Sequence, residues 1–193
     1  MLPGEFYHLF NHANGNENLF VETKNYDFFL EKLTKYTSPI CRLFSYCLMP
    51  NHLHLVIQIR YKEELCNLWK TPATLSELTE KQLELKTSKS FANLFSSYTQ
   101  AFNKTYHRRG SLFIPSMKMK LITDAQGICK VIHYTHSNPV HHGFTKGIAD
   151  WPHSSYHALI KTTPTKLERE YVLDLFGGLK AFIKYHEQPI DKK

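Results

Sequence analysis

The sequence predicts an α+β fold in which an antiparallel sheet packs against helices. Apolar residues alternate with polar ones in several short segments, which is typical of half-buried strands. In longer segments they recur every three or four residues, which is typical of amphipathic helices. The chain has 193 residues, of which 42% are hydrophobic and 21% charged, so it can bury a core without wholesale disorder. We therefore expect a single domain over residues 1–193.

The first third of the chain reads as strand, helix, strand and strand. Residues 6–13 are rich in aromatic side chains and end in an Asn-Gly-Asn turn signal at 14–16, as expected of a first strand. An amphipathic helix is predicted over 25–36 and a second strand over 41–48. The short connection at 49–51 favours a hairpin into a third strand. This order is half of a ferredoxin-like sheet.

Helical patterns dominate the middle of the chain. Residues 60–90 combine mixed charge with scattered leucines and are interpreted as one or two short helices, forming a helical insertion in the domain. Residues 91–104 place apolar side chains at three- and four-residue intervals, which predicts a well-buried helix. Tyr98 lies within that stripe and is interpreted as a core residue. Methionine and leucine then alternate with Lys118 and Lys120, which predicts a half-buried strand with a basic outer face.

Three further helices are predicted in the last third. Asp124 and the threonine before it supply an N-cap, and apolar residues at 128–132 form the buried face of the helix that follows. We expect this helix to end at Pro139, because proline disfavours helical geometry in the residue that precedes it. Two C-terminal helices are expected at about residues 167–176 and 179–185.

Two histidines lie within the predicted third strand. Successive side chains of a strand point to opposite faces, so His52 and His54 share one face while Leu53 and Leu55 fill the other. Neutral imidazole is the commonest metal ligand in proteins. By itself the pattern is more typical of a half-exposed strand whose histidines merely alternate with leucines; a metal site is the alternative, which the surrounding residues favour, including Pro50 and Asn51 at the start of the strand. His8 and His12 of the first strand fit no metal-ligand spacing and are interpreted as surface residues.

A metal held by two histidines usually needs further ligands, and phosphodiester chemistry needs a nucleophile; the helix before Pro139 offers both. Tyr134 and Asn138 are four residues apart, so they lie on one helix face, beside the apolar stripe and not within it. Lys130 lies near the same edge, where it could meet a phosphate. For the helix alone, the preferred interpretation is that Tyr134 is an aromatic residue at the core boundary and Asn138 a C-terminal cap.

Several motifs together resemble a known family. Leu-Met-Pro-Asn-His-Leu-His-Leu-Val at 48–56 resembles the signature of the single-tyrosine transposases of the HUH nuclease superfamily. The run 134–143 resembles the stretch, in the REP-associated branch of these transposases, that carries a nucleophilic tyrosine and an asparagine metal ligand four residues later. The Trp-Pro and Ser-Ser-Tyr patterns at 151–156 also match that branch, as does the opening strand at 4–11. The resemblance covers nearly all of the chain except residues 60–90.

The resemblance implies a fold, a reaction and a set of site residues. The fold is a ferredoxin-like antiparallel sheet packed with helices, with extra C-terminal helices. Mg²⁺ or Mn²⁺ would be held by His52, His54 and Asn138, and Tyr134 would attack a DNA phosphate to form a 5′-phosphotyrosine intermediate. The substrate would be single-stranded DNA, with hairpins at palindromic repeat ends. Such a protein would act as a DNA endonuclease and strand transferase, as a monomer or a homodimer.

Charge and composition agree with a nucleic-acid partner. The formal net charge is +7 and the isoelectric point about 9.1, which favours a polyanion. Arg108, Arg109, Lys118 and Lys120 are the expected contacts to the DNA backbone, together with Lys130. The four cysteines form no zinc or disulfide pattern, and the N-terminal residues lack the pattern of a signal peptide. We expect a cytoplasmic, DNA-associated protein with no membrane partner.

Two other functions fit the same residues. An aromatic, basic sheet can hold single-stranded nucleic acid by stacking and charge, without any chemistry. A metal phosphodiesterase could use water in place of Tyr134 as the nucleophile. The sequence does not identify the group that accepts the proton of Tyr134, whose unperturbed pKa is near 10.

Overall fold

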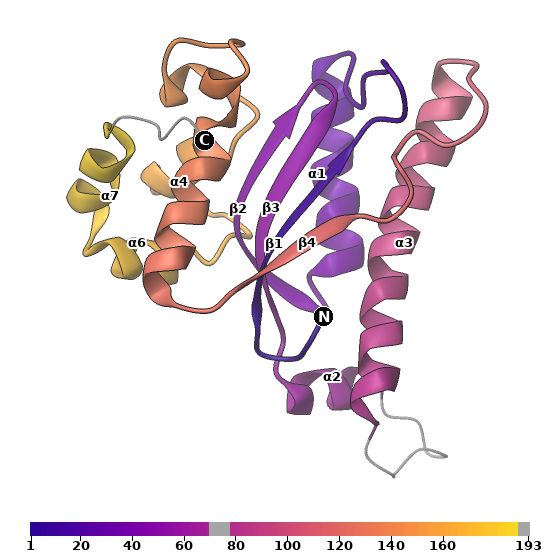
Figure 1. Cartoon of the computed structure of the whole chain (residues 1–193), viewed down its shortest axis with the longest axis horizontal. Helices are drawn as coiled ribbons and strands as arrows, with labels where there is room; N and C mark the ends of the chain where they lie inside the picture. The colour runs from indigo at the N-terminus through magenta and orange to yellow at the C-terminus, as the bar shows by residue number, and fades with distance from the viewer. Residues whose placement is uncertain (70–77, 189–193) are drawn as a thin grey trace.

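The computed structural model describes residues 1–69 and 78–188, and it has the predicted α+β architecture (Figure 1). Four antiparallel strands form one sheet in the order β2-β3-β1-β4, which is the strand order of a ferredoxin-like sheet. Its strands are β1 (Phe6–His12), β2 (Cys41–Met49), β3 (His52–Ile59) and β4 (Lys118–Ile122).

Two helices cover one face of the sheet. The first, α1 (Thr23–Thr37), follows β1, and the second, α3 (Glu80–Thr105), precedes β4. Leu53, Leu55 and Ile57 of β3 point to this side and join a core that includes Phe29 of α1 and Tyr98 of α3. Apolar packing against both helices therefore fixes which face of β3 is buried here.

The helices that follow β4 in the chain lie against the other face, to the left of the sheet in Figure 1. The helix α4 packs against β2 and β3, where Phe44 and Val56 meet Ile128 and Ile132. Phe182 joins the same core from the last helix. These elements are α4 (Ala125–His141), the 3-10 turn η1 (Ile148–Asp150), α5 (Tyr156–Ile160), α6 (Arg169–Phe176) and α7 (Leu179–His186). The two predicted C-terminal helices are confirmed as α6 and α7.

The predicted insertion is helical where the structure describes it. The helix α2 (Lys62–Trp69) opens the stretch, and the first turns of α3 close it. The side chain of Thr79 accepts a hydrogen bond from the backbone of Gln82 and thereby caps α3. The predicted helix at 91–104 is thus the second half of a longer one. Residues 70–77 of the insertion lie outside the described residues.

The predicted end of the helix α4 at Pro139 is wrong. Asp124 caps the helix as expected, accepting from the backbone N–H of Gly127 at 2.8 Å, but the helix continues to His141. Proline removes one backbone donor, and here it falls in the last turn, where little of the hydrogen-bond ladder remains to be lost. The side chain of Asn138 donates to the carbonyl of Tyr134 at 2.8 Å, which adds a bond to this turn.

The strand β4 is also less buried than its pattern predicts. Met119 and Leu121 are each 51% exposed, whereas only Ile122 of this strand is buried. β4 is the edge strand beside β1, and no helix in the described ranges is in extensive contact with it, so its apolar alternation does not correspond to a covered face. Lys118 and Lys120 are exposed as predicted.

The segment that follows η1 lies along the outer edge of β2. The indole N–H of Trp151 donates to the carbonyl of Leu48 at 3.0 Å, and the backbone of His153 accepts from Leu48 N–H at 2.9 Å. Ser155 then exchanges backbone and side-chain bonds with Tyr46. The Trp-Pro and Ser-Ser-Tyr patterns therefore hold the β2–β3 hairpin, which carries the two histidines.

No helix in the ranges 1–69 and 78–188 is long and apolar enough to cross a membrane. All four cysteines are free, and three of them are buried.

Candidate active site

The histidines of β3 lie on the face that α4 covers. His52 and His54 are 2% and 5% exposed, and their neighbours Leu53 and Leu55 point into the core of the opposite face. The alternation read from the sequence therefore holds, and both imidazoles are buried beneath α4.

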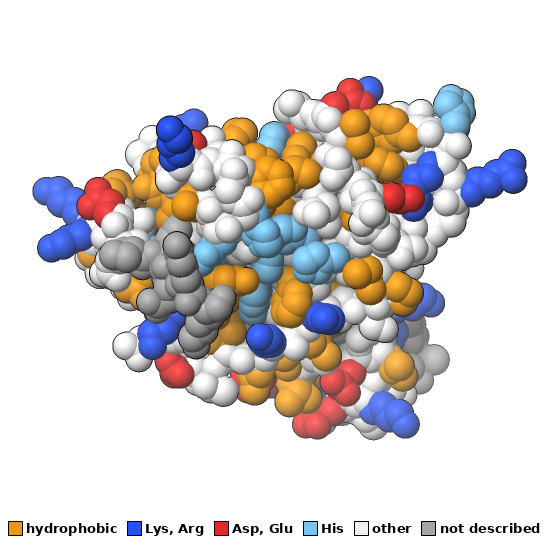
Figure 2. Space-filling view, turned by 45° about the horizontal axis from the view of Figure 1, so that its top comes forward, with side chains coloured by type: hydrophobic (Ala, Val, Ile, Leu, Met, Phe, Trp, Pro, Cys, Tyr) orange, Lys and Arg blue, Asp and Glu red, His pale blue; other side chains and the backbone are white. Residues whose placement is uncertain are grey.

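The neighbouring strand adds two more histidines. In the antiparallel register His12 lies opposite His52 and Phe10 lies opposite His54, so His8 and His12 share the face of the β3 pair. The rings of His12 and His52 stack with centroids 4.9 Å apart. We call His8, His12, His52, His54 and His142 the histidine cluster; Figure 2 shows histidine side chains gathered at the centre of one face.

Sequence reasoning missed this part of the cluster. His8 is 7% exposed and buried in the site, so its interpretation as a surface residue is wrong, whereas His12 is exposed as expected. His142, just beyond α4, brings its ring to 4.6 Å from that of His52. The usable signal was the even spacing of His8 and His12, which puts both on one face of a strand. The sequence does not give the register of β1 against β3, which brings these histidines together with His52 and His54.

The tautomer of His52 follows from its hydrogen bond. Nδ1 of His52 lies 2.8 Å from Oδ1 of Asn51. An amide oxygen can only accept, so Nδ1 carries the proton and Nε2 carries a lone pair. That Nε2 is buried and has no hydrogen-bond partner among the described residues. A buried lone pair without a donor is the arrangement that a bound cation would satisfy.

The environment keeps these imidazoles neutral. The pKa of His52 is lowered to about 3, chiefly by burial and then by the neighbouring His142 and His12. Burial, followed by the nearby His8, lowers the pKa of His54 to about 2. At neutral pH neither ring has to lose a proton before it can bind a metal.

Tyr134 lies over the cluster from α4. Its ring centroid is 5.8 Å from that of His8 and 5.7 Å from that of His54, with the rings edge to face. Tyr134 is 43% exposed and lies at the margin of the core. Tyr98 differs in every respect: it is 1% exposed, donates to the carbonyl of Leu19 at 2.6 Å, and burial raises its pKa. The interpretation of Tyr98 as core is confirmed.

Asn138 offers a second unsatisfied acceptor near the same helix end. Its Nδ2 donates to the carbonyl of Tyr134, which turns Oδ1 away from that bond, and Oδ1 is buried without a partner in the described ranges. Asn138 Oδ1 and His52 Nε2 are therefore both lone-pair atoms that lack a donor, and the residues fit a divalent cation. Within residues 1–69 and 78–188, no three His, Cys, Asp or Glu side chains form a metal site by themselves.

The predicted basic contacts fall into two groups. Lys118 and Lys120 lie opposite Phe10 and His8 in the β1–β4 register, so they border the histidine cluster, and Lys120 Nζ lies 6.0 Å from the Phe10 ring centroid. Lys130 is exposed on α4, one turn before Tyr134. Figure 2 shows basic side chains beside the histidines.

The two arginines lie in the loop after α3. The guanidinium of Arg108 pairs with Glu17 and donates to Asn103 at 2.8 Å and to the carbonyl of Ser111 at 2.8 Å. It is therefore occupied in holding this loop. Arg109 is exposed.

A buried polar chain holds the helix that carries Tyr134. His186 Nδ1 lies 2.8 Å from the carbonyl of Phe182, so it must donate, and its Nε2 then accepts from His136 Nδ1 at 2.9 Å. His136 Nε2 accepts from the hydroxyl of Ser155 at 2.7 Å, and Ser155 accepts from Tyr46 N–H at 2.9 Å. The chain ties α7, α4 and β2 together.

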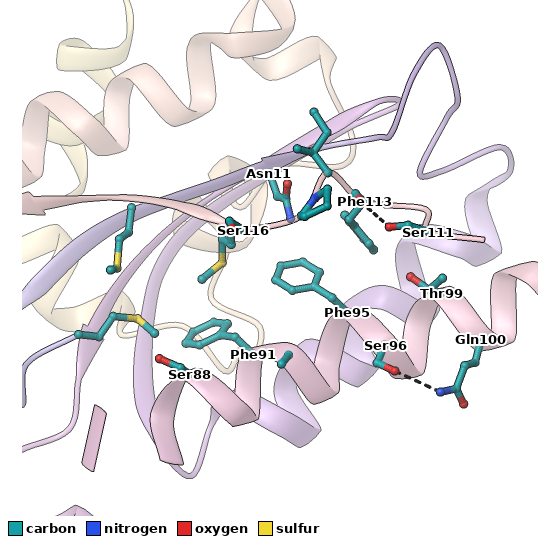
Figure 3. Close-up of a pocket in the computed structure, with 16 residues that line it drawn as sticks. Asn11, Ser88, Phe91, Phe95, Ser96, Thr99, Gln100, Ser111, Phe113 and Ser116 are labelled. Carbon is teal, nitrogen blue, oxygen red and sulfur yellow. Dashed lines mark hydrogen bonds between the residues drawn. The ribbon is translucent and has the colours of Figure 1, made fainter. Parts of the chain in front are cut away.

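A cavity of about 630 Å³ lies elsewhere in the structure (Figure 3). Phe91 and Phe95 line it from α3, Phe113 from the loop before β4, and Asn11 from β1. No His, Cys, Asp, Glu, Lys or Arg side chain lines this cavity. It belongs to the α1–α3 side of the sheet and lacks the groups that phosphoryl chemistry needs.

The fold and the site define a class. A ferredoxin-like sheet presents two neutral histidines to an exposed tyrosine on a covering helix, which is the arrangement that the resemblance to single-tyrosine transposases implies. No family model matches the sequence. A curated protein of Haemophilus influenzae, provisionally named a REP-associated tyrosine transposase, is 26% identical over 117 residues, covering 60% of this chain and 58% of that protein.

A solved structure gives the same indication. The structure described as the REP-associated tyrosine transposase bound to a REP hairpin matches with a TM-score of 0.60 and 17% identity, covering 83% of this chain and 81% of that one. The resemblance to the REP-associated tyrosine transposases is therefore confirmed. The matched region spans under two thirds of the length of the curated relative.

Proposed function

We propose that this protein is a metal-dependent DNA strand transferase that cleaves single-stranded DNA through a covalent 5′-phosphotyrosine intermediate. The observation that carries the proposal is the position of Tyr134, exposed above two buried, neutral histidines. A tyrosine so placed can approach a phosphate that is held against the face of the sheet. The other rings of the histidine cluster and the lysines of β4 surround the same point.

The reaction balances without a nucleotide cofactor. The Tyr134 oxygen attacks the scissile phosphorus, an O–P bond forms, and the bond from phosphorus to the 3′ oxygen breaks. The tyrosine proton leaves and the departing 3′ oxygen gains one, so a free 3′-hydroxyl results. Because the new bond is a phosphodiester, the 3′-hydroxyl of another strand can reverse the attack and join the two strands.

His52, His54 and Asn138 would hold Mg²⁺ or Mn²⁺. When bound, the cation supplies Lewis-acid stabilisation of the negative charge on the phosphate. The fit rests on the two buried acceptors without partners, His52 Nε2 and Asn138 Oδ1. Imidazole nitrogen is a poorer match to Mg²⁺, which prefers oxygen ligands, so we expect the tighter complex with Mn²⁺.

The proposed substrate is single-stranded DNA that carries a hairpin. The solved relative is bound to a REP hairpin, and the net charge of this chain is +7. An unpaired strand also exposes a phosphate to a tyrosine on a helix more readily than a duplex does. Binding of hairpin-bearing single strands should exceed that of matched duplex at one salt concentration, and equal affinities would contradict this substrate.

The decisive experiment removes one oxygen. Tyr134→Phe should abolish cleavage and the covalent adduct while folding and DNA binding survive, because only the nucleophilic hydroxyl is lost. A denaturing gel with a 3′-labelled, hairpin-bearing strand shows the adduct directly, since the downstream fragment stays on the protein through its 5′-phosphate. Tyr171→Phe is the matched control: Tyr171 is 47% exposed, lies on α6, and should leave cleavage unchanged.

The other outcomes identify the rival functions. Cleavage without an adduct that survives Tyr134→Phe would indicate water as nucleophile. No cleavage of any hairpin-bearing strand by wild type would favour a binding module without chemistry. Loss of the adduct in Tyr98→Phe alone would make Tyr98 the nucleophile. Full cleavage by the double variant His52→Ala/His54→Ala would place the metal elsewhere.

A further inference from the structure

His54 is held by a hydrogen bond from the neighbouring strand. Nε2 of His8 lies 2.9 Å from Nδ1 of His54, and both side chains are buried. The two rings are nearly parallel, at an interplanar angle of 20° with centroids 5.1 Å apart. One nitrogen of this pair must donate and the other must accept, so the two neutral imidazoles adopt their tautomers together.

The two ways of making this bond differ in what His54 can do. If His8 donates, neutral His54 carries its own proton on Nε2, and that nitrogen has no lone pair for a cation. If His54 donates from Nδ1, its Nε2 lone pair is free. Only the second arrangement makes Nε2 of His54 a ligand.

His52 shows the same arrangement, but its partner can only accept a hydrogen bond, so the tautomer of His52 is determined. Its Nδ1 faces the amide oxygen of Asn51, so its Nε2 is free of a proton and has no partner in the described chain. His52 and His54 lie on one face of β3, and each has its Nδ1 engaged by a side chain. For both histidines to bind a cation through Nε2, His8 must accept a hydrogen bond from Nδ1–H of His54, as Asn51 accepts one from Nδ1–H of His52.

We propose that His8 is a positioning residue. Its Nε2 accepts a hydrogen bond from Nδ1–H of His54, and so keeps the Nε2 lone pair of His54 free for a divalent cation. The proposal rests on the proposed function, in which His54 is a ligand. In metal sites the second nitrogen of a ligating histidine usually donates to a carboxylate, a carbonyl or water, and loss of such a partner lowers metal affinity about 10- to 100-fold. Here an imidazole nitrogen takes that place.

Replacements of His8 distinguish this role from simple packing. His8→Gln and His8→Glu keep an acceptor oxygen at about the reach of Nε2, whereas His8→Leu keeps bulk without an acceptor. We expect the Mn²⁺ dissociation constant of the full chain, measured by electron paramagnetic resonance without DNA, to rise about 10- to 100-fold in His8→Leu. It should change only a few-fold in His8→Gln and be no weaker in His8→Glu.

A packing role predicts the reverse order. Leucine suits a buried site, whereas a buried carboxylate is costly, so His8→Leu would then bind as well as wild type and His8→Glu would be worst. His157→Leu, which removes a half-buried histidine of α5, is the control and should leave Mn²⁺ affinity unchanged. Thermal melting of each metal-free variant verifies that it is folded.

Nitrogen NMR of the metal-free chain tests the tautomer itself. Two-bond ¹H–¹⁵N correlations should place the proton of His54 on Nδ1 in wild type and move it to Nε2, at least in part, in His8→Leu. A proton on Nε2 in wild type would overturn the proposal. If wild type binds no Mn²⁺, the proposed function fails and the role of His8 toward the cation falls with it. If wild type binds and His8→Leu binds equally well, only the role of His8 fails.

Discussion

Replacing His186 with glutamine should make the fold less sensitive to acid. His186 is 6% exposed and lies in the polar chain that joins α7 to α4. Its pKa is lowered from 6.5 to about 4, chiefly by burial, with a smaller contribution from His133 and an opposing one from the bond to the Phe182 carbonyl. The groups that face it are His133 and His136 of α4, Tyr156 of α5 and its own neighbour Tyr185.

The direction in which stability changes with pH depends on whether the folded or the unfolded chain binds more protons. Between pH 6.5 and 4 the unfolded chain protonates this histidine and the folded chain does not, so stability falls as pH falls through that window. The shift of the pKa from 6.5 to about 4 corresponds to about 3 kcal/mol of the free energy of unfolding. Most of this contribution is lost by about pH 4.5. Above pH 6.5 the contribution is constant.

Glutamine removes the titration and keeps an acceptor for His136 Nδ1–H. The free energy of unfolding, measured by urea denaturation at about pH 7.5 and pH 4.5, should drop by about 2–3 kcal/mol less in His186→Gln than in wild type. His107→Asn is the control: His107 is exposed, and asparagine tolerates its positive φ of 51°. An equal acid loss in wild type and His186→Gln would refute the reasoning, because His186 would then not be the neutral link described.

Three further outcomes are expected. Ser155→Ala should lower the free energy of unfolding by about 1–3 kcal/mol for each buried partner left unsatisfied, measured by denaturant titration, since its hydroxyl serves both Tyr46 N–H and His136. Mn²⁺ should raise the melting temperature of wild type but not of Asn138→Ala, and an equal rise in both would exclude Asn138 as a ligand. Lys120→Ala should weaken hairpin binding and reduce the slope of log affinity against log salt by about one, whereas an unchanged slope would mean no phosphate contact.

Local patterns were enough to predict the elements that carry the site. The alternation through 52–57 predicts which face of β3 holds His52 and His54, and the hairpin at 49–51 follows from the short connection between two strands. The spacing of Tyr134 from the apolar stripe of α4 predicts its exposure, which is 43%. Each of these depends on residues a few positions apart, where helix and strand periods determine direction.

Features that depend on distant partners could not be predicted in this way. Met119 and Leu121 are exposed because no helix that the structure describes is in extensive contact with β4, which no pattern within the strand indicates. The continuation of α4 past Pro139 depends on how few hydrogen bonds remain beyond it. The polar chain from Ser155 through His136 to His186 joins segments that are 19 and 50 residues apart, and each residue alone carries no signal.

The histidine cluster depends on the register of β1 against β3, which the sequence alone does not give. In the strand order β2-β3-β1-β4, β1 lies directly beside β3, so the side chains of His8 and His12 on the α4 face meet those of His54 and His52. A shift of one residue in that pairing would instead place Tyr7 and Leu9 on the α4 face and remove His8 from His54. Because Tyr7 and Leu9 are required in the opposite core, the same apolar burial that stabilises the sheet also fixes the contact between His8 and His54. The site is therefore positioned by core residues that touch neither a metal nor DNA.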